Sequence, residues 1–145
     1  MKGTPVIKTF ICALTIAVLT SGIASADEVY SARLQDGSEN MPDIVYEFDN
    51  GDQAVWVAAD GNSRFYIDGL GGVFENRQSY KGRYVFYSGE GPGCDSGVFA
   101  DHLGNQVPYW GHLSIQWSND SNFVMQIGEC DGKADEGMTI IGQNK

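Results

Sequence analysis

Alternation of apolar and polar residues with a period of two is the feature that most limits the possible fold of this chain. In HLSIQW, residues 112–117, the side chains of Leu113, Ile115 and Trp117 occupy one face, and NFVMQIGEC, residues 122–130, repeats the pattern. Side chains alternate between the two faces of a strand, whereas a helix repeats about every 3.6 residues. Both segments therefore predict half-buried β-strands.

Other segments carry the same signal. Ile44, Tyr46 and Phe48 alternate along residues 43–49, and QAVWVAA, SRFYID, GRYVFYS and SGVFAD are further strand candidates. Turns rich in Gly, Asn and Asp separate the candidates: DNGDQ, ADGNS, GLGG, GEGPG and SNDSN. No segment of the sequence shows a sustained helical period. The sequence predicts one all-β domain, either a small antiparallel β-barrel or a β-sandwich.

The N-terminus predicts export. Two lysines open the chain, an uncharged apolar run covers residues 10–19, and Ala-Ser-Ala follows at residues 24–26. This order is typical of a secretory signal peptide cleaved after Ala26. The apolar run is too short for a membrane span, and no later segment is longer. We expect a signal peptide over 1–26 and a single domain over 27–145 that is secreted or periplasmic.

The charge of the chain is strongly negative. Nine basic and 19 acidic residues give a net charge of −10, and cleavage of the signal removes Lys2 and Lys8, leaving seven basic residues and a net charge of −12. Phosphate binding needs a basic stripe, so this composition argues against a nucleic-acid partner. It is typical of a solubilising surface, or of one that attracts a basic partner.

The cysteines predict one disulfide. Cys12 lies in the predicted signal peptide, so only Cys94 and Cys130 remain in the exported chain. An even pair in an oxidising compartment favours a disulfide bond. Neither cysteine belongs to a C-x-x-C pair, which makes a metal-ligand role the weaker alternative.

One triplet suggests serine catalysis. Asp95-Ser96-Gly97 matches three positions of the G-D-S-G-G motif of trypsin-like proteases, but those enzymes are about twice this length and their histidine precedes the serine. Here His102 and His112 both follow Ser96, and Cys94 replaces the first glycine of a lipase-type elbow. The segment is interpreted more simply as a turn that leads into a strand.

The histidines also suggest a metal site. Asp101, His102 and His112 form a set of two imidazoles and one carboxylate, with Asp95 as a possible fourth ligand. Their spacing matches no metal signature. The acidic segment 131–142 likewise departs from a calcium-binding EF-hand loop, because Glu stands where that loop needs Gly. The sequence predicts no metal and no cofactor.

Aromatic residues are the remaining candidates for binding. Tyr109 and Trp110 follow Pro108 at a loop or strand start, and Trp56 lies on the face opposite its two valine neighbours. Exposed rings on a sheet, with Trp117 among them, would stack on sugars or anchor a protein partner. Packing of the same rings inside the domain is the alternative.

Together these features favour an exported, non-catalytic binding protein. The more specific expectation is an inhibitor or immunity-type protein for a basic, envelope-targeting enzyme. The acidic residues Asp131, Asp135 and Glu136 would attract the partner, and Tyr109 and Trp110 would hold it. The alternatives are a carbohydrate- or small-ligand-binding β-domain and a small hydrolase that uses Ser96 or a His/Asp metal site.

The general layout is similar to that of the periplasmic lysozyme inhibitors: a signal peptide, an acidic antiparallel domain and one disulfide. The S-G-x-x-Y signature of that group is missing, because Ser88-Gly89 and Ser96-Gly97 are followed by Pro92 and Ala100 at the tyrosine position. The sequence therefore assigns no family.

Overall fold

The structure, a computed structural model, describes residues 28–70, 78–119 and 121–145. The predicted signal peptide and part of the predicted GLGG turn lie outside these residues. The elements are β1 (Val29–Leu34), β2 (Asn40–Asp49), β3 (Gln53–Ala58), β4 (Ser63–Asp68), β5 (Ser79–Phe86), β6 (Phe99–Ala100), β7 (Gln106–Val107), β8 (Trp110–Asn119), β9 (Asn122–Glu129), the 3₁₀ turn η1 (Ala134–Glu136) and β10 (Met138–Asn144). The prediction of an all-β fold is confirmed.

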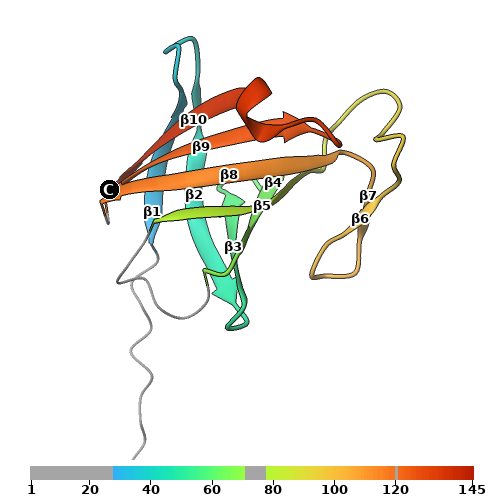
Figure 1. Ribbon diagram of the computed structural model, residues 1–145, viewed down its shortest axis with the longest axis horizontal. Helices are drawn as coiled ribbons and strands as arrows, with labels where there is room; N and C mark the ends of the chain where they lie inside the picture. The colour runs from blue at the N-terminus through green and yellow to red at the C-terminus, as the bar shows by residue number, and fades with distance from the viewer. Residues whose placement is uncertain (1–27, 71–77, 120) are drawn as a thin grey trace, which may run out of the picture.

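Eight of the strands close into one antiparallel barrel in the order β1-β10-β9-β8-β5-β4-β3-β2 (Figure 1). Consecutive strands are neighbours in the barrel except at one place, where residues 87–109 connect β5 to β8 and form the β6–β7 hairpin on the way. Closure pairs every barrel strand on both sides and leaves no free sheet edge. The sequence did not distinguish a β-barrel from a β-sandwich, and the structure is a closed barrel.

The barrel interior is packed with side chains. Trp117 contacts Trp56, Phe123 and Tyr30 with ring centroids 5.4, 4.9 and 5.3 Å apart. These rings belong to a larger group of buried side chains inside the barrel, which we call the interior cluster. Its buried members are Tyr30, Ala32, Ile44, Ala54, Trp56, Ala58, Phe65, Ile67, Leu70, Leu113, Ile115, Trp117, Phe123, Met125, Ile127 and Ile140. Small eight-stranded barrels commonly fill their interior in this way.

The two segments with the clearest alternation lie as the sequence predicts. Leu113, Ile115 and Trp117 of β8 are buried in the interior, and so are Phe123 and Met125 of β9. Opposed strands pair them in register, with Ile115 facing Met125 and Trp117 facing Phe123.

Two predictions about alternation need correction. Phe48 does not share the interior with Ile44 and Tyr46, because the pairing of β2 with β3 shifts register between Tyr46 and Phe48 and so turns Phe48 to the outer face. The extra residue of a bulge reverses the facing of the residues after it. The predicted strand SGVFAD is reduced to the two residues of β6, which pair with β7 and not with the barrel.

A second apolar cluster lies on the outside of the barrel wall. Its buried members are Val55, Tyr66, Val85, Val107 and Trp110, and Phe48, Tyr87, Cys94 and Phe99 pack against them. We call this set the outer cluster. It forms because the segment 87–109, yellow to orange in Figure 1, folds back beside the barrel and covers β3, β4 and β5. None of the helical structure in the described ranges is long and apolar enough to cross a membrane.

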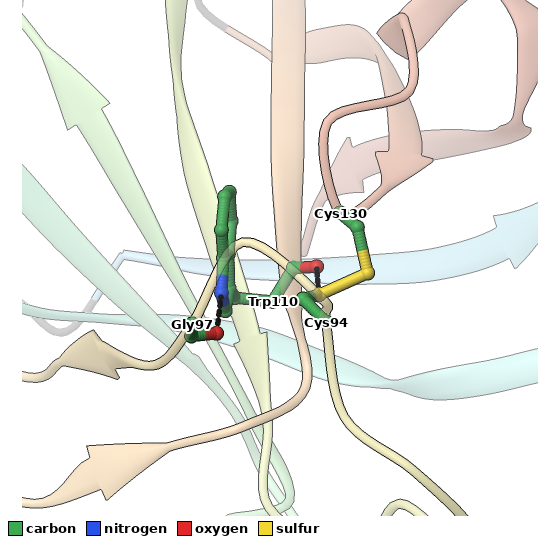
Figure 2. The surroundings of a disulfide bond; sticks show 4 residues. All are labelled: Cys94, Gly97, Trp110 and Cys130. Atoms are coloured by element: carbon green, nitrogen blue, oxygen red, sulfur yellow. Dashed lines mark hydrogen bonds between the residues drawn. A yellow bond between two sulfur atoms is a disulfide. The ribbon is translucent and has the colours of Figure 1, made fainter.

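The predicted disulfide is confirmed. Cys94 and Cys130 are bonded, with their Cα atoms 5.4 Å apart, and the bond joins segment 87–109 to the connection after β9 (Figure 2). The indole Nε1 of Trp110 donates a hydrogen bond to the carbonyl oxygen of Gly97 at 2.9 Å. The Sγ of Cys94 lies 3.3 Å from the carbonyl oxygen of Trp110, a contact and not a hydrogen bond because a disulfide sulfur carries no proton.

Candidate functional site

Four connections meet at one end of the barrel, which we call the loop end. Strands of an antiparallel barrel alternate in direction, so alternate connections share an end: residues 35–39, 59–62, 87–109 and 130–137. Hydrogen bonds and the disulfide tie them together. Tyr87 N donates to Asn62 O at 2.8 Å, and Gln35 N donates at 3.0 Å to the carbonyl oxygen of Thr139 on β10, two residues beyond the connection 130–137.

The loop end is strongly acidic. Its connections, with Glu129 at the end of β9, carry ten carboxylates: Asp36, Glu39, Asp60, Glu90, Asp95, Asp101, Glu129, Asp131, Asp135 and Glu136. All of them except Asp101 are exposed. Lys133 is the one lysine or arginine within the four connections, and its Nζ lies 3.3 Å from Oε1 of Glu136. The resulting negative potential attracts cations to this end of the molecule.

Most exposed apolar side chains lie on or next to the same connections. Among the described residues, five large hydrophobic side chains are exposed, and four of them, Phe86, Val98, Leu103 and Met138, lie in or next to the loop-end connections. The fifth, Val124, is on the outer face of β9. Leu103 is the most exposed at 61 %. Apolar side chains that gather on a polar surface mark interaction sites far more often than single scattered ones.

The β6–β7 hairpin holds Leu103 in a fixed position. Asp101 is 5 % exposed, and its carboxylate accepts hydrogen bonds from Leu103 N at 3.0 Å, Asn105 N at 2.7 Å, Asn105 Nδ2 at 2.9 Å and the Tyr87 hydroxyl at 2.8 Å. Burial by itself would raise the pKa of Asp101, but these hydrogen bonds lower it below the ordinary aspartate value. The charged form of Asp101 therefore orders the tip.

Polar contacts fasten the hairpin to the barrel wall. Arg64 on β4 donates from Nε and Nη2 to the two carboxylate oxygens of Glu47, at 2.8 and 3.1 Å, and from Nη1 to the Tyr87 hydroxyl at 3.0 Å. The hydrogen bond to Glu47 is the main reason that the pKa of Arg64 is raised. His102 Nδ1 lies 2.9 Å from the Tyr66 hydroxyl, and its Nε2 lies 3.9 Å from Glu47.

An open pocket of about 450 Å³ lies at the mouth of the barrel, and we call it the mouth pocket. Its apolar lining comes from Tyr84, Ile127 and Met138, and its charged lining from Glu129, Lys133 and Glu136. Tyr84 and Ile127 belong to the faces that point into the barrel, where they pack on the interior cluster. Burial, and then the negative charge of Glu129, raise the pKa of the Tyr84 hydroxyl.

The predicted aromatic binding residues are mostly buried. Trp56 is 1 % exposed inside the barrel, and Trp110 is 7 % exposed in the outer cluster. Tyr109 is half-buried, and its hydroxyl donates to the carbonyl oxygen of Gly91. Trp117 is also buried. The tryptophans therefore form no exposed row of rings in the part of the chain that the structure describes, and this arrangement does not favour the carbohydrate-binding alternative.

The predicted acidic residues do lie together, since Asp131, Asp135 and Glu136 are all exposed on the connection after β9. Residues that the sequence reasoning missed are Phe86, Leu103 and Met138. Phe86 and Met138 had a readable signal, because each continues the inward-facing register of its strand to the very end, next to a turn. An apolar side chain at that position lies at the barrel mouth.

The candidate catalytic residues do not assemble. Ser96 is exposed, and within the described residues no hydrogen bond joins it to His102 or His112. His112 lines a second open groove of about 510 Å³ with Lys81 and Asp131, and this groove adjoins the mouth pocket at Gly132 and Lys133. No group of three His, Cys, Asp or Glu side chains in the described ranges is placed to hold a metal ion.

Comparison with known proteins gives no assignment. No family model matches the chain, and no curated protein or solved structure matches it at a significant level.

Proposed function

We propose that the protein is an exported, non-catalytic binding protein whose loop end binds a basic protein, as an inhibitor or immunity-type protein would bind its enzyme. One observation carries the proposal: the connections that leave one end of the barrel, with the residues next to them, carry nine exposed carboxylates and four of the five exposed large hydrophobic side chains of the described residues. Charge alone serves solubility, and isolated apolar residues are common on surfaces. Their coincidence on tied loops fits a binding face better than either feature does.

The two kinds of residue have different roles in this proposal. Carboxylates that are exposed and screened by salt mainly raise the rate of encounter with a cationic protein. Apolar side chains that enter pockets of the partner determine how long the complex lasts. Leu103 is the strongest anchor candidate, because Asp101 already holds its backbone and little further ordering is needed on binding.

This assignment changes the anchors expected from the sequence. Trp110 supports the loop end from beneath, through the outer cluster and its hydrogen bond to Gly97, and is too buried to enter a partner. Tyr109 is half-buried and its hydroxyl is already engaged by Gly91. Leu103, Phe86 and Met138 take the anchoring role in their place.

The test is a capture experiment with matched variants. The mature domain, Leu103→Ser and Val124→Ser are immobilised separately and exposed to the envelope and secreted proteins of the organism that makes the chain. Both substitutions remove one exposed aliphatic side chain, but only Leu103 belongs to a loop-end connection, where it lies at the tip of the hairpin that packs on the barrel wall. We expect a basic protein to be retained by the mature domain and by Val124→Ser, and to be retained weakly by Leu103→Ser.

Two results would contradict the proposal. One is retention of an acidic protein or a neutral sugar as the main ligand. The other is equal loss of the basic protein in both variants, which would place the interface away from the loop end.

A further inference from the structure

The mouth pocket combines an apolar lining with negative charge, and the ligand inferred for it rests on the proposed function. Tyr84, Ile127 and Met138 supply an aromatic ring, a branched aliphatic side chain and a thioether. Met138 is 46 % exposed and is not a member of the interior cluster. Glu129 stands close enough to Tyr84 for its charge to act on the phenol. Tyr84 is half-buried and Ile127 is 9 % exposed, so Met138 provides most of the accessible apolar surface. An apolar lining beside a carboxylate suits a ligand that is itself both apolar and cationic.

Close backbone approaches build the pocket. A Cβ atom at Gly111 would lie 2.6 Å from the ring of Tyr84, so the absence of a side chain at this position allows the ring to pack against the backbone of β8. A Cβ atom at Gly128 would lie 2.3 Å from the carbonyl oxygen of Lys133, and one at Gly137 would lie 1.9 Å from that of Ile127. The connection after β9 can therefore fold back onto the end of its own strand, and it carries Lys133 and Glu136 to the edge of the pocket.

The charges of the lining favour a cation over an anion. Glu129 and Glu136 bring two carboxylates, and Lys133 brings one ammonium group whose Nζ is 3.3 Å from Glu136. The lysine therefore offsets Glu136, while the charge of Glu129 remains for a ligand. The face of a tyrosine ring attracts a cation, and a methionine side chain adapts to an aliphatic chain.

We propose that the mouth pocket binds a cationic group on an aliphatic stem, the chemistry of a lysine or arginine side chain that the basic partner inserts into the barrel mouth. The stem packs on Ile127 and Met138, and the charged head lies between the ring of Tyr84 and the carboxylate of Glu129. The pocket thus provides a specific binding site for one cationic side chain of the partner, whereas the other acids of the loop end attract the partner through long-range electrostatics.

The site can be tested without the partner, with three small probes of equal chain length: hexylguanidinium, hexanol and hexanoate. The mature chain has three methionines, Met41, Met125 and Met138, so their methyl groups give a simple NMR spectrum. Met125 is buried in the interior and serves as an internal control. We expect hexylguanidinium to shift the Met138 methyl resonance saturably, hexanol to shift it weakly and hexanoate not at all, with Met125 unchanged.

Two substitutions with opposite expected effects sharpen the test. Glu129→Gln should weaken hexylguanidinium binding by roughly two- to fivefold, the range of an exposed ion pair, and Lys133→Met should strengthen it by a similar factor. Asp52→Asn, an exposed carboxylate on the β2–β3 connection at the other end of the barrel, should leave it unchanged. Backbone amide spectra of each variant confirm that the fold is kept.

The proposal is overturned if hexylguanidinium causes no saturable shift up to its solubility limit, or if hexanol and hexanoate bind as well as it does. It is also overturned if Glu129→Gln and Lys133→Met change binding in the same direction. The pocket proposal and the proposed function can fail independently. A pocket that binds the cation in a protein that retains no basic partner would defeat the proposed function alone, and a partner whose binding ignores Glu129→Gln would defeat the pocket alone.

Discussion

The interior cluster and the outer cluster are both aromatic and both buried, but they are built differently. The buried members of the interior cluster come from seven of the eight barrel strands and from Leu70, and β5 adds the half-buried Tyr80 and Tyr84. Their side chains alternate between the two faces of each strand, except where a bulge shifts the register. The outer cluster joins the wall of the barrel to a segment of more than twenty residues that has only two short strands of its own. Regular strand pairing positions the first, while a disulfide and one buried carboxylate position the second.

This difference separates stability from function. The interior cluster decides whether the barrel forms, since its loss removes the side chains that all eight strands share. The outer cluster decides where Leu103 and the acids of residues 87–109 stand relative to the barrel mouth. Changes in the interior should therefore unfold the whole domain, and changes in the outer cluster should loosen the loop end first.

Phe65→Ala should have the largest effect, because Phe65 is almost fully buried in the barrel. We expect the free energy of unfolding to fall by about 3–5 kcal/mol, measured by chemical denaturation. Phe99→Ala is the matched change in the outer cluster, where Phe99 is half-buried, and should cost about 1–2 kcal/mol. Equal losses would show that the two clusters form one cooperative core.

Removal of the disulfide should come next. Cys94 and Cys130 are separated by 36 positions, and a loop of this size predicts a loss of roughly 3–4 kcal/mol in the double serine variant. The barrel strands should keep their far-ultraviolet circular dichroism, while amide exchange in residues 87–109 speeds up. Two free thiols in the oxidised, unfolded wild-type protein would show that the bond does not form.

Asp101→Asn should have a smaller and more local effect. The amide side chain keeps the shape, and its one oxygen can still accept from the two backbone donors, which share Oδ1. The amide nitrogen then replaces Oδ2, so the Tyr87 hydroxyl and Asn105 Nδ2 lose their acceptor and the tip loosens, at a cost of about 1–3 kcal/mol. We expect faster amide hydrogen exchange at Leu103 and Asn105, the two backbone donors to Asp101, and little change in the barrel strands. Unchanged exchange at both amides would contradict the role given to Asp101.

Acid should reproduce that effect in the wild-type protein. The pKa of Asp101 is lower in the folded chain than in the unfolded chain, so its contribution is fully present above the ordinary aspartate value of about 3.9 and is lost as the pH falls through the lowered value. Amide exchange at Leu103, corrected for intrinsic rates, should therefore rise in the acid range below that value. Asp101→Asn should lack this dependence.

Sequence reasoning was most successful where strand pairing repeats. Leu113, Ile115, Trp117, Phe123 and Met125 could be placed in the core because a barrel strand has the same two faces along its length. Phe48 could not, since a single bulge reversed its facing and a bulge leaves no clear mark in a sequence. The disulfide could be predicted from the cysteine count, but not that it would tie two loops of one barrel end.

The candidate site was harder to predict for a physical reason. Trp56 and Trp110 were expected to offer binding surface, but large rings bury more apolar area than any other side chain and enter whichever core is near. Trp110 is buried outside the barrel, in the outer cluster, which depends on contacts between segments that are far apart in the sequence. The exposed set at the loop end depends on barrel closure, which brings together connections far apart in sequence.

The most direct test of the proposed binding face compares the two ends of the barrel at equal change in charge. Asp131→Asn with Asp135→Asn removes two exposed carboxylates from the loop end, and Asp52→Asn with Asp68→Asn removes two from the opposite end. The association rate of each double variant with the captured basic protein is measured over a series of salt concentrations. We expect the loop-end variant to associate several-fold more slowly than wild type at low salt and to converge with it at high salt, with the opposite-end variant close to wild type throughout. Equal slowing in both variants, or a wild-type rate indifferent to salt, would contradict a binding face at the loop end.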